Sequence, residues 1–381
     1  LYVSNDVIST PRFDEILWRC MESDPRIAIA VPVCNSASNF QAISVPYANN
    51  DLIGMTSFAE GYNHCNPRKW EDRTRLFQIM ACYRPQVLRQ MRLAFDPMFC
   101  YDMFADDDHS TVLRRMGYRQ VLCKDVFVHH YGSATIGAGQ FQVMDLGRDQ
   151  FRQKYGVDGW ASLGMDLCAA LSNFSLSFSG PVRILALNPM FGESVLALAN
   201  RLRACGGGEV TVDALTEEKG YLDDAQGLFR RGGLLQEKDQ VLEGQYDLAI
   251  VGCNLGRCID LRSVLQTAAG RLKAGGLLIV QSENFYSVSN LSAALSGKPP
   301  EEGIFLRDPE ENLSLRIVND GVLSAELSQN GMVLERSIYL NNESWGTTAE
   351  GLAAALGLQN CGEAKSLLQS LGKFSIWRRK S

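Results

Sequence analysis

Paired cysteines of the Cys-x-x-Cys type and long apolar runs are both absent from this sequence of 381 residues. Its 11 cysteines are scattered from position 20 to position 361, and the closest two, Cys253 and Cys258, are five residues apart. A zinc site therefore has no paired spacing to use, and a disulfide framework is not expected in so long a chain. Free thiols are typical of a reducing compartment, so we expect a cytoplasmic protein.

No apolar run approaches the ~20 residues that a helix needs to span a bilayer, so we expect no transmembrane segment. A basic surplus is missing too, because 37 Lys and Arg stand against 43 Asp and Glu. The resulting net charge of −6 argues against nucleic acid as a partner. The basic end at 377–380 leaves peripheral contact with anionic lipid open, although a solvated tail explains it as well.

The first part of the chain mixes strands, helices and loops. Residues 1–3 are typical of the end of a buried strand, and Thr10 followed by proline predicts a helix start. Apolar residues then recur with helical spacing over 13–21, and the apolar run 27–31 predicts a buried strand. Residues 34–75 are rich in Asn, Ser, Pro and Gly, and this composition predicts long loops.

From position 182 onward, apolar runs of strand length alternate with stripes of helical spacing. Such alternation predicts parallel βαβ units and a doubly wound sheet. The runs lie at 183–187, 210–212, 246–251 and 277–280, and the stripes at 195–202 and 261–272.

Polar residues suited to metal and acid–base chemistry gather in the first part. Asp6 follows the first strand, three consecutive aspartates occupy positions 106–108, and His130 ends a strand-like run. Carboxylate oxygens and a histidine suit a divalent cation such as Mg²⁺ or Mn²⁺, and a carboxylate can accept a proton from a hydroxyl group. Each also has an ordinary interpretation, as a turn, a negatively charged helix N-terminus or a strand-end histidine pair.

Seven short motifs in this part resemble the middle of a family 2 glycosyltransferase and follow its order from position 3 to position 135. They are Val3-Ser-Asn-Asp-Val-Ile-Ser-Thr-Pro, Glu22-Ser-Asp-Pro-Arg-Ile, Val31-Pro-Val-Cys-Asn-Ser-Ala-Ser, Phe95-Asp96, Phe104-Ala-Asp-Asp-Asp, Leu113-Arg-Arg-Met-Gly-Tyr and Val128-His-His-Tyr-Gly-Ser-Ala-Thr. The resemblance implies a metal-dependent, inverting bacterial enzyme of the GT-A type in polysaccharide biosynthesis. It would move a sugar from a nucleotide-sugar donor to a glycan or glycoconjugate acceptor.

The resemblance also assigns roles to individual residues. Asp6 falls in the family's metal-binding acidic motif, and His130 matches a histidine expected to contact the metal or the diphosphate. The family's catalytic Glu-Asp pair falls on Ala105 and Asp106, so Asp106 is the expected base, and Ala105 is a departure from the pattern. The alternatives for the base are the next two aspartates, Asp107 and Asp108.

The nucleotide-binding half of such an enzyme, at least two βαβ units of roughly 30 residues each, is not found ahead of these motifs. The sequence starts with Leu1 rather than Met, so we expect the natural N-terminus to lie upstream. On this interpretation, the chain as given transfers sugar poorly or not at all.

The second part resembles class I S-adenosylmethionine-dependent methyltransferases in topology and spacing over about 160 residues. The resemblance rests on the turn after the first strand and on Tyr246-Asp-Leu-Ala-Ile-Val, Leu272-Lys-Ala-Gly-Gly-Leu and Ser282-Glu-Asn. It implies that Asn188, Gly192 and Asp213, the last as an acid at the end of the second strand, bind the cofactor. The turn departs from the family's glycine-rich pattern, because Pro189 removes an amide donor and Phe191 adds bulk.

The sequence therefore predicts an α/β protein, with a partial GT-A glycosyltransferase domain followed by a Rossmann-like, doubly wound methyltransferase-type domain. The expected segments are a glycosyltransferase-like domain at 1–145, a helical connector at 146–175, a methyltransferase-like domain at 176–345 and a helical tail at 346–381. Two alternatives to the glycosyltransferase stay open. One is a methyltransferase that modifies a sugar, and the other is a non-catalytic scaffold built on a degenerate methyltransferase fold.

Overall fold

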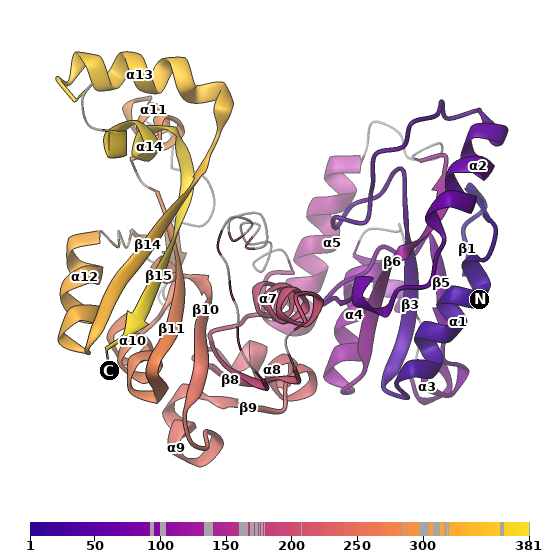
Figure 1. Ribbon diagram of the computed structural model, residues 1–381, viewed down its shortest axis with the longest axis horizontal. Helices are drawn as coiled ribbons and strands as arrows, with labels where there is room; N and C mark the ends of the chain where they lie inside the picture. Colours follow the sequence, from indigo (N-terminus) through magenta and orange to yellow (C-terminus); the bar gives the residue numbers. More distant parts are fainter. Residues whose placement is uncertain are drawn as a thin grey trace. The chain divides into compact units, whose positions relative to one another are not determined.

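The computed structural model describes most of the chain as two compact units (Figure 1). The N-terminal unit comprises Leu1–Leu163, Phe191–Gly206 and Gly220–Leu228, and the C-terminal unit comprises Gly164–Met190, Gly207–Lys219 and Phe229–Ser381. The described residues are 1–91, 95–99, 104–132, 140–159, 180–206, 208–284, 286–296, 305–307, 313–315, 320–358 and 362–380, with single positions at 167, 171, 174, 176, 178 and 318. Most of the predicted connector beyond position 159, and motif residues 133–135, lie outside them.

The N-terminal unit is built on a mixed sheet with the strand order β1-β5-β3-β6-β2, and β4 also pairs with β6. The central strands β3 and β6 are parallel, and the other pairs are antiparallel. The strands are β1 (Tyr2–Val3), β2 (Val7–Ile8), β3 (Ile27–Cys34), β4 (Trp70–Asp72), β5 (Met80–Tyr83) and β6 (Arg119–His130). The helices of this unit are α1 (Phe13–Ser23), α2 (Leu52–Tyr62), α3 (Pro85–Gln90), α4 (Ala105–Arg115), α5 (Gln140–Tyr155), α7 (Glu193–Ala204) and α8 (Leu222–Leu228).

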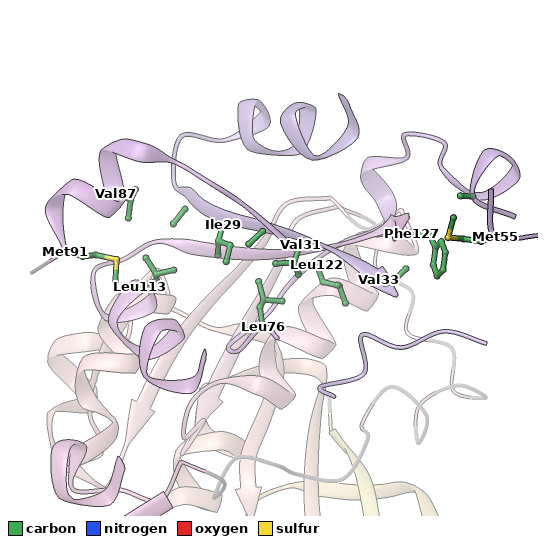
Figure 2. Packing of buried hydrophobic residues seen from close by; sticks show 13 residues of the cluster. Ile29, Val31, Val33, Met55, Leu76, Val87, Met91, Leu113, Leu122 and Phe127 are labelled. Carbon is green, nitrogen blue, oxygen red and sulfur yellow. The ribbon is translucent and has the colours of Figure 1, made fainter. Parts of the chain in front are cut away.

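Apolar side chains from both central strands form the main core of this unit. Figure 2 shows Ile29, Val31 and Val33 of β3 beside Leu122 of β6, with Leu76 below them. Every residue of β3 is buried, as expected for a strand covered on both faces. The strand and the amphipathic helix α1 confirm the patterns at 27–31 and 13–21.

Three local predictions for this unit are wrong. Residues 1–3 are not buried, because β1 is an edge strand and Leu1 is 68% exposed. Thr10 does not cap α1; Arg12 precedes the helix in a left-handed conformation, and the Thr10 hydroxyl donates to the carbonyl of Phe127. The stretch 34–75 is not all loop, because it contains α2 and β4.

The C-terminal unit holds a seven-stranded sheet with the order β14-β15-β11-β10-β7-β8-β9. In this order, the strands β11, β10, β7, β8 and β9 run parallel to one another, and β15 is antiparallel to both of its neighbours. The strands are β7 (Val182–Leu187), β8 (Val210–Thr216), β9 (Arg231–Leu234), β10 (Tyr246–Asn254), β11 (Leu272–Glu283), β14 (Met332–Asn341) and β15 (Ser370–Arg379); β12 (Phe305–Arg307) and β13 (Leu313–Leu315) form a separate pair. The predicted Rossmann-like α/β fold is therefore present in this unit.

Short helices accompany this sheet. They are α9 (Lys238–Val241), α10 (Leu261–Arg271), α11 (Val288–Leu295), α12 (Asp320–Gln329), α13 (Gly346–Ala355) and α14 (Gly362–Gln369). Figure 1 shows β14 and β15 as a long ribbon with α13 and α14 near one end and α12 beside the other. Where the sequence predicts a helical tail over 346–381, the structure has two helices and then the strand β15, in which Trp377 is buried. In the described part of the chain, no helix has the length and apolar character to cross a membrane.

Candidate functional site

The structure brings Asp6 and His130 together in the N-terminal unit. The antiparallel pairing of β2 with β6 places Val7 opposite His130, and the Nε2 atom of His130 lies 3.1 Å from Oδ2 of Asp6. The other ring nitrogen, Nδ1, faces the carbonyl oxygen of Ser36. Asn35 fixes the backbone of His130 from both sides, since its Oδ1 accepts from the amide at 2.8 Å and its Nδ2 donates to the carbonyl at 2.9 Å.

The three consecutive aspartates open α4, and their carboxylates have different partners. Asp106 accepts from the backbone amide of Gln78 at 3.4 Å, and Asp107 forms an ion pair with Arg75. Asp108 is buried and accepts from Lys154 Nζ and from the Tyr155 hydroxyl, each at 2.6 Å. Asp108 therefore has a structural role, holding α5 to the start of α4.

The segment Phe77–Gln78 contacts both Asp106 and His130. Gln78, whose amide donates to Asp106, follows Phe77, and the ring of Phe77 lies 6.1 Å from the ring of His130. In the parts of the chain that the structure describes, no three His, Cys, Asp or Glu side chains are grouped so that they could hold a metal ion. The predicted divalent-metal cofactor is therefore not supported, because among the described residues no further His, Cys, Asp or Glu joins the Asp6–His130 pair.

In the C-terminal unit, the carboxyl ends of β7 and β8 meet at Asn188 and Glu217. Asn188 has a left-handed backbone (φ 46°), and its amide donates to the carbonyl of Leu215 at 2.7 Å. Its side chain bonds Glu217 twice, because Oδ1 accepts from the Glu217 amide at 2.8 Å and Nδ2 donates to the carboxylate. Gly192, the third residue predicted to bind the cofactor, also has a positive φ (90°), but it precedes α7 in the N-terminal unit.

Glu217, rather than Asp213, is the acid at the end of the second strand. The strand β8 runs to Thr216, three residues past Asp213, so Asp213 lies inside the sheet and is 1% exposed. Its carboxylate forms an ion pair with Arg230 and accepts from the Tyr246 hydroxyl at 2.8 Å. Burial and this hydrogen bond raise the pKa of the Tyr246 hydroxyl. Asp213 therefore makes its contacts inside the sheet. Glu217 was not among the site residues predicted from the sequence.

A segment that follows β10 lies over the carboxylate of Glu217. The carboxylate oxygens of Glu217 accept from the backbone amides of Ile259 at 2.9 Å and Asp260 at 2.6 Å, in addition to the side chain of Asn188. The loop after β7 lies close to β10, since a Cβ placed on Gly252 would meet the Cα of Pro189 at 2.7 Å. This close approach leaves room only for glycine at position 252.

The bulk of Phe191 suggested that its ring fills the turn after β7, but the structure places the ring elsewhere. It packs within the N-terminal unit against Phe151 and Tyr221, with ring centroids 6.0 and 5.1 Å away. The guanidinium carbon of Arg114 lies 4.6 Å from the centroid of the same ring.

Comparison with known proteins gives matches of fold only. Neither a protein-family model nor a curated protein matches the chain. Among solved structures, a SAM-dependent methyltransferase from Archaeoglobus fulgidus is 14% identical, with a TM-score of 0.38, over 60% of this chain and 98% of that one. S-adenosylmethionine-dependent methyltransferases from Mesorhizobium loti (17% identical, TM-score 0.34, 57% and 100% covered) and Clostridium acetobutylicum (14%, 0.35, 61% and 99%) also match.

These findings overturn the glycosyltransferase interpretation. The three matching structures named above are SAM-dependent methyltransferases, and no family model matches the chain. The predictions of a family 2, GT-A type enzyme, of a nucleotide-sugar donor and of a glycan acceptor are therefore wrong. These predictions rested on seven short motifs. In the structure, two residues of these motifs, Asp6 and His130, are in contact, but within the described residues they are not part of a metal centre.

Proposed function

We propose that the C-terminal unit binds S-adenosylmethionine and transfers its methyl group to an acceptor. One observation carries the proposal: Asn188 and Glu217 lie together where β7 and β8 end. In the strand order, β8 and β9 extend from one side of β7, and β10 and β11 from the other. Doubly wound sheets bind ligands outside the carboxyl ends of their strands at such a reversal, and an acid after the second strand bonds ribose hydroxyls.

The residues present fit the ribose of the cofactor. A carboxylate offers about four acceptor positions, and Glu217 uses three of them for Asn188 and the amides of Ile259 and Asp260. Two ribose hydroxyls can replace the two amides as donors once the segment over Glu217 moves away. Asn188 then keeps the carboxylate oriented through its side chain. When bound, the cofactor supplies a methyl group on a positively charged sulfur.

Calorimetric titration of the whole chain with S-adenosylmethionine tests this assignment. We expect a dissociation constant in the micromolar range, and at least a roughly tenfold weaker one for Glu217→Gln, since hydrogen bonds to a charged group contribute about 1.5–3 kcal/mol. Glu243→Gln is the matched control, because Glu243 is exposed and, within the described part of the chain, forms its ion pair with Arg231 alone. Equal affinity in both variants would place the ribose elsewhere.

One observation favours a second candidate, a non-catalytic domain with this fold. Pro189 lies on Gly252, and the carboxylate of Glu217 is covered by amides of its own chain. If this closed arrangement is permanent, the titration releases no heat at millimolar cofactor while circular dichroism shows a folded protein. That result would reject the methyltransferase and favour the scaffold.

A further inference from the structure

Two thiols lie in contact at the carboxyl end of β10. The Sγ atoms of Cys253 and Cys258 are 3.9 Å apart, and both residues are buried, with 5% and 0% of their surface exposed. Both are thiols in the structure, without a disulfide. The chain returns on itself between them, because Asn254 Oδ1 accepts from the Gly256 amide and the Cys258 amide donates to the carbonyl of Leu255.

The same segment contacts Glu217. Cys258 directly precedes Ile259 and Asp260, whose amides bond the carboxylate of Glu217. Asn188 contacts both Glu217 and Cys258, since its Nδ2 donates to the Glu217 carboxylate and lies 3.7 Å from the Cys258 sulfur. A change in the position of Cys258 therefore moves the two amides that cover Glu217.

We propose that Cys253 and Cys258 form a reversible disulfide that fixes the segment 254–260 over Glu217. A disulfide has a sulfur–sulfur distance of about 2.05 Å, so the two sulfurs must approach by roughly 1.9 Å. The four residues between the cysteines are Asn254, which ends β10, and a single 3₁₀ turn (Leu255–Arg257), so this short connection has to absorb the movement.

The chemical step is thiol–disulfide exchange with a small disulfide of the glutathione class. One cysteine loses its proton, and its thiolate attacks a sulfur of the small disulfide, which releases one small thiolate. The second cysteine then attacks the mixed disulfide and releases the other. The two cysteines lose two protons and two electrons, and the small disulfide is reduced to two thiols.

Peptide mapping detects this bond directly, since trypsin cuts after Arg257, between the two cysteines. In the reduced protein, Cys253 lies in peptide 239–257 and Cys258 in peptide 258–262. After incubation of the whole folded chain with oxidised glutathione, alkylation in denaturant and digestion, we expect the two peptides to be linked. Dithiothreitol should separate them, and both cysteines should then take up the alkylating reagent.

Variants and alternative outcomes keep the test decisive. Cys253→Ser and Cys258→Ser should each abolish the linked peptide, whereas Cys205→Ser, at an exposed cysteine, should leave it unchanged. The wild-type digest needs no variant, so poor folding of a serine variant does not affect it. Alkylation of both cysteines after oxidation, or their linkage to glutathione without an internal bond, would overturn the proposal.

The consequence for the cofactor rests on the proposed function. The oxidised chain should bind S-adenosylmethionine at least about tenfold more weakly than the reduced chain, because the amides that compete for Glu217 are held in place. If neither form binds the cofactor but the linked peptide is present, the methyltransferase assignment fails and the disulfide stands. If both forms bind equally and the linked peptide is present, the disulfide does not control Glu217, and that part of the proposal fails.

Discussion

The carboxylates of Asp213 and Glu217 are four residues apart, yet they have unrelated surroundings. Asp213 faces Arg230 and Tyr246 inside the sheet, and Glu217 faces Asn188 and two backbone amides at its edge. The sequence indicated that an acid follows the second strand, but the predicted run ended at Val212, before the buried Ala214 and Leu215, so it suggested the wrong acid. Where a strand ends depends on its neighbour, and β8 continues because Thr216 pairs with Leu234 of β9.

Another buried acid, Asp224, holds the two arginines that end α4. Asp224 is fully buried, its Oδ1 accepts from Arg114, and its Oδ2 accepts from Arg115 at 2.7 Å. We expect Asp224→Asn to lower the free energy of unfolding by about 3–5 kcal/mol, because it leaves a buried guanidinium without its counter-charge. Asp223→Asn is the matched control, since Asp223 is 68% exposed and 3.7 Å from Arg115, and it should cost less than about 1 kcal/mol. Urea denaturation measures both, and similar losses would contradict the assignment.

Asp24 should make stability depend on acidity. Its hydrogen bonds to Arg26 and Arg119 outweigh the effect of burial and hold the pKa of its carboxyl group well below the usual range. A carboxyl group with a lowered pKa stabilises the fold fully above its ordinary pKa of about 3.9, and this contribution is lost as the pH falls towards the folded value.

We therefore expect Asp24→Asn to lower the free energy of unfolding at pH 7 and to flatten its decline below about pH 4. Chemical denaturation at a series of pH values checks both effects. Glu22→Gln, at an exposed position of α1, should leave the curve unchanged. An Asp24→Asn curve parallel to that of the wild type would show that Asp24 does not titrate with folding.

At the scale of elements, periodicity found those that stand on their own pattern. The strands β7 and β10 and the helices α1 and α10 lie where apolar spacing predicted them. The spacing did not reveal β15, because Lys373, Ser375 and Arg378 interrupt its apolar residues and its partners β11 and β14 are distant in sequence. A strand buried between two neighbours can contain such polar residues when pairing satisfies its backbone.

The contact of the loop after β7 with β10 gives a prediction at this scale. We expect Gly252→Ala to lower the free energy of unfolding by about 1–3 kcal/mol, because the added methyl group meets the Cα of Pro189 at 2.7 Å. Gly270→Ala, inside α10 with nothing within 4 Å, should instead stabilise by roughly 0.5–1 kcal/mol. Thermal unfolding of the two variants should shift in opposite directions, and equal shifts would show that the loop yields freely.

For the whole molecule, the sequence predicted the class of the sheet but not the activity. Alternating strands and helices were enough to predict the doubly wound sheet of the C-terminal unit, because each element carries its own apolar pattern. The glycosyltransferase motifs were short and polar, and such residues serve turns and helix starts as readily as active sites. Asp107 and Asp108 show this, since they bind Arg75 and Lys154.

The last strand of the chain should decide whether the sheet of the C-terminal unit forms. The strand β15 pairs with Leu277–Glu283 of β11 on one side and with β14 on the other. Removing residues 370–381 leaves β11 and β14 without their partner and exposes the edges and apolar side chains of these two strands. We therefore expect a largely insoluble protein. Removing only 380–381 keeps the strand and should leave solubility and near-ultraviolet circular dichroism unchanged. A soluble chain of 369 residues with a native spectrum would contradict this prediction, because it would show that β11 is stable as an edge strand.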